Sequence, residues 1–128
     1  MSVRDPQGGL LCDPTRIRMR LHALDVWVGD AAVLTDLAEV RGVLRAGAAH
    51  GRATVVEEAF HVFPNGAVTG VLVLAQSHLS IHTWPELALA NVDLLSYGEV
   101  DGARALDVVA RGLGAIRTRT ITVPRSIA

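Results

Sequence analysis

The sequence predicts an α+β fold: a two-layer sandwich in which an antiparallel sheet carries two helices on one face. Three observations point to it. Apolar residues recur mostly at alternate positions, as in half-buried strands, while two stretches switch to helical spacing. A Pro-Asn-Gly turn at 64–66 joins two apolar runs, and such a short link requires antiparallel neighbours. The 128 residues amount to one domain.

Composition narrows the classes of function. Apolar residues make up 50% of the chain, charged residues 20%, and the formal net charge is −1, so nothing indicates nucleic acid or a membrane surface as partner. The single cysteine, Cys12, excludes an internal disulfide framework. No apolar run approaches the roughly 20 residues that span a bilayer. The chain does not start with a charged segment followed by an apolar one, so we expect a cytoplasmic protein.

The first part of the chain divides into an arm and the start of the domain. Residues 1–17 are expected to form a flexible N-terminal arm, and residues 18–128 a single domain. Residues 18–28 alternate as in a strand, with one change of parity that indicates a bulge. Asp30 can cap a helix that stops near Gly47. The apolar stripe of that helix consists of Val33, Leu37, Val40 and Leu44.

Strands continue through the middle of the chain. Residues 53–63 and 68–76 are predicted to form a hairpin around the Pro-Asn-Gly turn. Residues 71–74 are continuously apolar, so we expect both faces of that strand to be covered. The run 76–86 is a poor helix former, and 89–95 has the pattern of another strand.

The last elements complete the order β-α-β-β-β-β-α-β. A turn is expected at 96–98, then a helix capped by Asp101 and closed by Gly112 and Gly114, then a strand at 118–123 with one face in solvent. Both helices are expected on the same face of the sheet. A second copy of the chain is the simplest cover for the other face, which predicts a homodimer.

The run 76–86, Gln-Ser-His-Leu-Ser-Ile-His-Thr-Trp-Pro-Glu, has the highest density of reactive side chains. His78 and His82 lie four residues apart, but on a strand that is about 13 Å, too far for one metal ion to bridge. Ser77 with His82 and either Asp93 or Glu86 could be a catalytic triad, although no Gly-x-Ser-x-Gly elbow holds the serine. A further reading is that the histidines are hydrogen-bonded at a strand end. It suits the run less well, because a segment rich in polar and reactive side chains follows a buried strand directly.

The string Ser-His-Leu-Ser-Ile-His-Thr-Trp-Pro-Glu at 77–86 resembles the signature of the small prokaryotic S-adenosylmethionine decarboxylases. These enzymes cleave themselves and make their own pyruvoyl group. The likeness extends over roughly residues 18–124. It includes the turn at 63–70 and the Asn-Val-Asp-Leu strand at 91–94.

The resemblance implies a mechanism. Ser77 attacks the backbone carbonyl of Gln76, which turns the peptide bond into an ester. A base then removes the α-proton of Ser77, and elimination followed by hydrolysis leaves a pyruvoyl group. This built-in cofactor forms a Schiff base with a substrate amine and accepts electrons as CO₂ leaves.

The resemblance also assigns roles to other residues. His82 matches the processing base, and Thr69 matches a hydroxyl that assists processing and is usually serine in the family. Glu86 matches the carboxylate that binds the ribose hydroxyls. Phe63 matches an aromatic residue of the nucleoside pocket, whose π face attracts the sulfonium cation.

Two residues depart from the family pattern. Gln76 stands where the family has glutamate, which leaves the attacked backbone carbonyl in place. In Ser96-Tyr97-Gly98, Tyr97 replaces the cysteine that protonates the product carbanion, and a phenol is a weaker acid than a thiol. Three functions therefore stay open: an S-adenosylmethionine decarboxylase that supplies the aminopropyl donor for spermidine, the same pyruvoyl chemistry on arginine or ornithine, and a catalytically inactive homologue that binds or regulates a partner.

One geometric conflict is visible in the sequence. Ser77 and His82 have opposite parity, so on a regular strand their side chains face opposite ways. We therefore expect a bend or an irregular turn between them.

Overall fold

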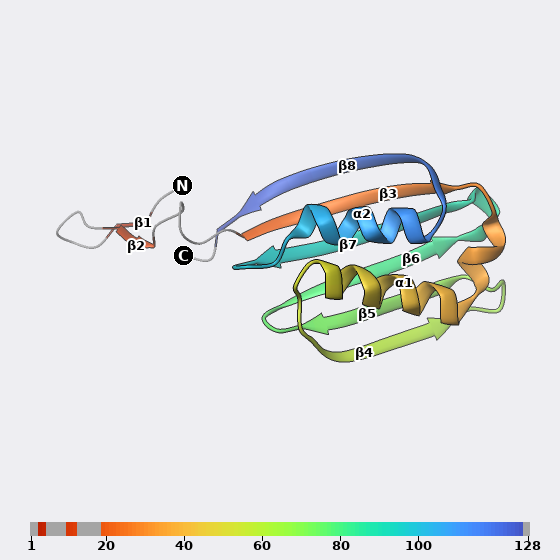
Figure 1. Ribbon diagram of the computed structural model, residues 1–128, viewed down its shortest axis with the longest axis horizontal. Helices are drawn as coiled ribbons and strands as arrows, with labels where there is room; N and C mark the ends of the chain where they lie inside the picture. The colour runs from red at the N-terminus through yellow and green to blue at the C-terminus, as the bar shows by residue number, and fades with distance from the viewer. Residues whose placement is uncertain (1–2, 5–9, 13–18, 127–128) are drawn as a thin grey trace.

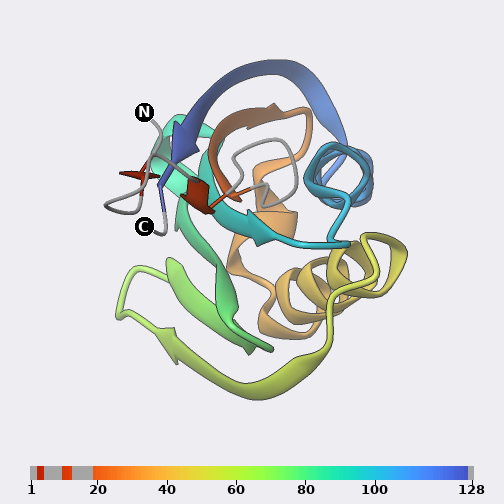
Figure 2. The same cartoon turned by 90° about the vertical axis from the view of Figure 1, so that its left-hand side faces the viewer.

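The computed structural model describes residues 3–4, 10–12 and 19–126. Its body is a six-stranded antiparallel sheet in the order β4-β5-β6-β7-β3-β8. Both helices, α1 and α2, pack side by side on one face of this sheet (Figures 1 and 2). The predicted α+β sandwich is confirmed. The predicted boundary between arm and domain lies outside the described residues and stays a prediction.

The elements follow the predicted order. The strands of the main sheet are β3 (Met19–Val28), β4 (Val55–Val62), β5 (Val68–Leu74), β6 (Ser77–Trp84), β7 (Leu89–Tyr97) and β8 (Ala115–Arg125). The helices are α1 (Leu37–His50) and α2 (Gly102–Gly112), with short 3₁₀ turns η1 (Ala31–Thr35) and η2 (Pro85–Leu87). A separate pair, β1 (Val3–Arg4) and β2 (Leu10–Cys12), lies in the arm. Within the described part of the chain, no helix is long and apolar enough to cross a membrane.

The first helix begins later and ends later than predicted. Asp30 caps only the turn η1, whereas Asp36 Oδ1 accepts a hydrogen bond from Glu39 N at 3.2 Å and starts α1. Gly47 lies inside the helix instead of ending it. A Cβ atom added there would lie 2.6 Å from Val109 Cγ2 of α2. The glycine is therefore explained by the close approach of the two helices.

The predicted change of parity in the first strand is wrong. β3 alternates regularly, and the side chains on its helix-facing side are buried: His22, Leu24, Val26 and Val28. The remaining apolar residues of β3, such as Leu21 and Ala23, lie on the opposite face. Both faces of this strand carry apolar side chains, which produced the apparent shift in the sequence. The irregular pairing is with β8, between Trp27 and Val28.

The core fills the space between the sheet and the helices. Its fully buried side chains include Val26, Leu34, Val40, Leu44, Leu72, Leu79, Val92, Leu94 and Val109. The other face of the sheet, which we call the open face, has no covering layer within the described residues. Val73 (41%), Trp84 (39%), Ile121 (48%) and Val123 (43%) are partly exposed there. The prediction that both faces of 71–74 are covered is therefore not met within one chain.

Two predicted boundaries near the C-terminus are corrected. β7 runs through Tyr97, so the expected turn at 96–98 begins only at Gly98, which has a φ of +63°. β8 is longer than the predicted 118–123. Its residues after Ala115 are exposed on both faces, so the expectation that only one face lies in solvent is wrong.

Candidate active site

The reactive run forms a regular strand. β6 pairs residue by residue with β5 and with β7, and no register shift interrupts either ladder. The expected bend between Ser77 and His82 is therefore absent from this described strand, and that prediction is wrong. Five residues of strand separate the two by roughly 17 Å, and their side chains lie on opposite faces of the sheet.

The Ser77 end of β6 lies at a tight turn. Leu74 pairs with Ser77, so the hairpin between β5 and β6 contains only Ala75 and Gln76. Gln76 has a φ of +64°, a left-handed conformation that costs a residue with a side chain on the order of 1–3 kcal/mol. Ser77 Oγ is buried, and no described residue hydrogen-bonds to it. The bond predicted to break thus joins Gln76, which is strained, to Ser77, whose hydroxyl has no hydrogen-bond partner among the described residues.

The His82 end of β6 gathers several predicted site residues on the open face. Thr69 Oγ1 and His82 Nδ1 lie 2.6 Å apart. The ring of His82 lies edge-on to Phe63, with centroids 6.1 Å apart, and to Trp84, with centroids 4.3 Å apart. Glu86 follows in η2 and is exposed. The structure therefore brings Thr69, His82 and Phe63 together but leaves Ser77 at the other end of the strand.

A polar row continues from His82 across the open face. In the ladder register, Thr69, His82, Asn91 and Asp25 occupy one line across four strands. Trp84 Nε1 donates to Asn91 Oδ1 at 2.7 Å, and Asn91 Nδ2 donates to Asp25 Oδ1 at 2.8 Å. Asn91 and Asp25 were not predicted from the sequence as site residues. The alternation of the two strands could have placed both on the face of His82.

The geometry of β6 excludes a catalytic triad within one chain, and it also bears on a metal site at the two histidines. A catalytic triad needs Ser77 within hydrogen-bonding reach of His82, and one strand holds these residues at its two ends, so a single chain cannot form that triad. His78 and His82 do share the open face. The described residues contain no group of three or more histidine, cysteine, aspartate or glutamate side chains placed to hold a metal ion.

Similarity to known proteins identifies the family. Residues 20–126 match the family described as S-adenosylmethionine decarboxylase. The chain belongs to this family. The match covers the six-stranded sheet from Arg20 onward and both helices, so the resemblance stated from the run at 77–86 is confirmed.

Individual relatives agree with this family. The S-adenosylmethionine decarboxylase proenzyme of Pseudomonas paraeruginosa is 42% identical over 81 residues, which cover 62% of this chain and 51% of the relative. The chain thus spans about half the length of the Pseudomonas relatives it matches. The proenzyme of Anoxybacillus flavithermus is 34% identical over 103 residues, 80% of this chain and 83% of that protein. The crystal structure of the adenosylmethionine decarboxylase from Aquifex aeolicus has a TM-score of 0.79 and 28% identity, over 88% of this chain and 94% of that one.

One departure from the decarboxylase pattern lies at the Ser77 end. Tyr97 is the last residue of β7, opposite Met19, and is half-buried on the open face. The pairing of β6 with β7 stops at His78 and Leu95, so Tyr97 lies two residues past the last paired residue, at the end of β7 that runs toward the turn of Gln76.

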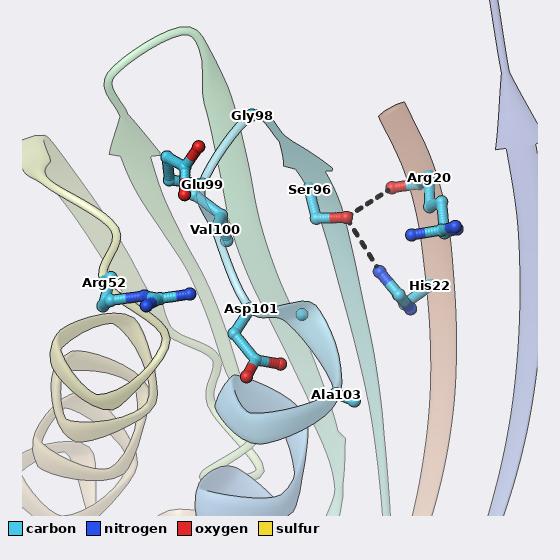
Figure 3. A pocket seen from close by; sticks show the side chains of 10 residues that line it. Arg20, His22, Arg52, Ser96, Gly98, Glu99, Val100, Asp101 and Ala103 are labelled. Atoms are coloured by element: carbon cyan, nitrogen blue, oxygen red, sulfur yellow. Dashed lines mark hydrogen bonds between the residues drawn. The ribbon is translucent and has the colours of Figure 1, made fainter. Parts of the chain in front are cut away.

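A second feature that was not predicted is the contact of His22 with Ser96, on the helix-covered side of the sheet. His22 Nε2 lies 2.9 Å from Ser96 Oγ (Figure 3). His22 Nδ1 lies 3.3 Å from Thr122 Oγ1. Burial, followed by the nearby charge of Arg20, lowers the pKa of His22 from its ordinary value of 6.5. A cavity of about 470 Å³ adjoins the pair, lined by Arg20, Arg52, Glu99 and Asp101 among others (Figure 3). The signal in the sequence that could have identified His22 is a histidine at a core-facing position of a predicted strand.

Proposed function

We propose that this chain is a cytoplasmic, self-cleaving, pyruvoyl-dependent S-adenosylmethionine decarboxylase that supplies the aminopropyl donor for spermidine synthesis. The observation that carries the proposal is the hairpin between β5 and β6. It presents a strained Gln76 followed by the buried hydroxyl of Ser77, to which no described residue hydrogen-bonds. Membership of the family and the proenzyme names of its relatives support the same reading.

The residues around Ser77 fit the formation of a pyruvoyl group. Buried hydroxyls are almost always hydrogen-bonded, so an unpartnered one, such as Ser77 Oγ in the described structure, marks a group available for reaction. Cleavage relieves the left-handed backbone at Gln76, because the turn is then no longer continuous. The pyruvoyl group supplies a ketone that takes up the substrate amine and accepts electrons as CO₂ leaves.

The open-face cluster suits the binding and proton-transfer roles. The 2.6 Å contact with Thr69 fixes His82 through Nδ1, which leaves Nε2 to take or give a proton. Phe63 presents a partly exposed ring on which an adenine can stack and which attracts a sulfonium cation. The exposed carboxylate of Glu86 can accept hydrogen bonds from ribose hydroxyls.

We also propose that the active enzyme is a homodimer formed through the open face. His82 cannot reach Ser77 in its own chain, and the face that carries His82 exposes apolar side chains such as Val73 and Ile121. A two-fold axis perpendicular to β6 and near Ser80 makes the two β6 strands antiparallel. His82 of one copy then lies over the Gln76–Ser77 bond of the other, so the second copy both covers the face and completes the site.

Tyr97 favours a second candidate, the same pyruvoyl chemistry on arginine or ornithine. A phenol at position 97 changes both the shape and the proton donor of the site relative to a cysteine. Asp93 and Glu99 are carboxylates that could attract a cationic side chain. The similarities to named relatives support S-adenosylmethionine as the first substrate to test. A catalytically inactive homologue is the third candidate, and it requires that no cleavage occurs.

Denaturing mass spectrometry of the full chain tests the proposal. We expect two fragments that separate between Gln76 and Ser77, the second blocked by a pyruvoyl group. Ser77→Ala should stay whole and release no CO₂, whereas the matched variant Ser80→Ala, on the same strand, should still be cleaved. Release of labelled CO₂ from S-adenosylmethionine, arginine and ornithine then identifies the substrate. A wild-type chain that stays intact after long incubation would leave only the inactive homologue.

A further inference from the structure

The hydroxyl of Ser77 needs a proton acceptor on its own side of the sheet. Attack on Gln76 requires Oγ to lose its proton, and neutral hydroxyls are weak nucleophiles without an adjacent base. Ser77 shares the helix-facing parity of Leu79 and Ile81, both of which are buried beneath the helices. The imidazole of His82 lies on the opposite face, so it is poorly placed to take this particular proton from either copy.

Ser96 lies across the strand pair from Ser77. The register that pairs His78 with Leu95, continued by one residue, places Ser77 opposite Ser96. The Ser96 side chain also points to the helix-covered side, where it contacts His22. Opposed residues on one face of an antiparallel pair have Cβ atoms about 4.5–5.5 Å apart, within which a rotamer change brings two hydroxyls into contact.

Ser96 is held by His22. The Ser96 hydroxyl has two acceptors in reach, His22 Nε2 at 2.9 Å and the Arg20 carbonyl oxygen at 3.4 Å, and the shorter contact is the stronger (Figure 3). When His22 carries its proton on Nδ1, that N–H donates to Thr122 Oγ1, and Nε2 accepts from Ser96. The first residue of α2, Gly102, leaves room for the ring, because a Cβ atom there would lie 2.4 Å from Nε2.

We propose that Ser96 and His22 form a proton relay for the first step of self-cleavage, a role that rests on the proposed function above. Ser77 Oγ bonds to the carbonyl carbon of Gln76 as its proton passes to Ser96, whose own proton passes to His22 Nε2. The carbon–nitrogen bond then breaks, and the departing nitrogen of residue 77 recovers a proton by the same route. The products are an ester and a neutral His22. In this relay Ser96 contacts Ser77 Oγ once a rotamer change has brought the two hydroxyls together, and His22 is a positioning residue that acts through Ser96.

The relay divides the work between the two faces of the sheet. Ser96 and His22 act on the hydroxyl proton from the helix-covered side and are supplied by the same chain as Ser77. His82 acts later, on the α-proton, from the open face. The two bases therefore stall the reaction at different stages when they are removed. Loss of the relay leaves an intact peptide bond, whereas loss of His82 leaves an ester.

The surroundings of His22 set the pH at which the relay works. Burial and the charge of Arg20 lower the pKa of His22, so the imidazole is neutral and able to accept a proton at neutral pH. Ester formation should slow as the pH falls through that lowered pKa. The charged residues that line the cavities on either side of His22 are Arg20, Arg52, Glu99, Asp101 and Asp107.

The test follows full-length chains that are refolded from denaturant, with cleavage measured over time by denaturing mass spectrometry. His22→Gln keeps a hydrogen-bonding group near Ser96 but cannot shuttle the proton. We expect it to slow cleavage by roughly 10²-fold and to abolish the acid limb of the pH profile. Hydroxylamine, which splits esters, should leave this variant whole and should split His82→Ala between residues 76 and 77.

Three further variants keep the test decisive. Ser96→Ala should stall like His22→Gln, and Ser96→Thr should restore cleavage because it keeps the hydroxyl. His50→Gln, an exposed histidine at the end of α1, should cleave like the wild type. The relay is overturned if the wild type is cleaved and His22→Gln and Ser96→Ala match its rate and pH profile, or if they accumulate ester. A wild type that never cleaves overturns the proposed function as well, so the two failures are distinguishable.

Discussion

The two ends of β6 belong to one motif but differ in the face of the sheet they use, in their hydrogen bonds and in their neighbours. At one end, His82 lies on the open face, fixed by Thr69 and flanked by the rings of Phe63 and Trp84. At the other end, Ser77 lies beside a tight turn, faces the helices and has no hydrogen-bond partner among the described residues. A continuous run of sequence therefore builds two half-sites roughly 17 Å apart. Under the proposed function, the first half-site holds the processing base and the second holds the bond that breaks.

The largest expected effect comes from substituting His82 in one chain and Ser77 in another. His82→Ala should slow completion of self-cleavage by roughly 10²–10⁴-fold, the usual contribution of a general base. If the half-sites meet between two copies, refolding His82→Ala chains together with Ser77→Ala chains should restore cleavage of the His82→Ala chain. Mass spectrometry distinguishes the two chains by mass. Cleavage that never returns in the mixture would contradict a shared site.

The next contrast sets the two faces of the sheet against each other. Leu79→Ala, on the helix-covered face of β6, should lower the free energy of unfolding by about 2–5 kcal/mol, because it leaves a cavity in a fully buried core. Val73→Asp, on the open face, should leave the unfolding of a single chain nearly unchanged and should dissociate the dimer. Urea unfolding and sedimentation at several protein concentrations measure both. A Val73→Asp chain that remains dimeric would place the interface elsewhere.

The sequence predicted the layers of the fold better than the geometry of the site. The period of the apolar residues and the turn at 64–66 were enough for the sheet, the two helices and their order. The run at 77–86 was enough for the family. Helix ends were misplaced because Gly47 serves the contact between the helices, which depends on tertiary packing. The contact between Thr69 and His82 was not predicted, because it depends on a hairpin register that local pattern does not specify.

His22 and Ser96 were missed for a related reason. Each is an ordinary polar residue in the sequence, and the two lie 74 positions apart. Only the pairing of β3 with β7 brings them together, on the side of the sheet where buried side chains are expected. Parity could have placed Ser77 on that same side. The expected bend toward His82 hid this.

A smaller effect should distinguish the Ser77 end of β6, near which His22 lies, from the His82 end. It concerns how the free energy of unfolding changes at acid pH. Burial lowers the pKa of His22 in the folded chain, so the unfolded chain binds the extra proton more readily. The free energy of unfolding should therefore fall as the pH drops below about 6.5, the ordinary value for histidine. His22→Leu should remove that part of the slope, whereas His50→Gln should not. Urea unfolding at pH 5 to 8 measures it, and equal slopes in wild type and His22→Leu would contradict the assignment.

The smallest expected effect tests whether the polar row on the open face orients the ring of His82. Trp84→Phe keeps an aromatic ring beside His82 but removes the N–H that donates to Asn91 at 2.7 Å. Because Trp84 is partly exposed, this hydrogen bond should contribute only about 0.5 kcal/mol, which corresponds to roughly a twofold slower cleavage. Asn91→Ala also breaks the link to Asp25 and should slow cleavage further. If both variants cleave at the wild-type rate, the row is not needed to orient His82, and the contact with Thr69 alone fixes the base.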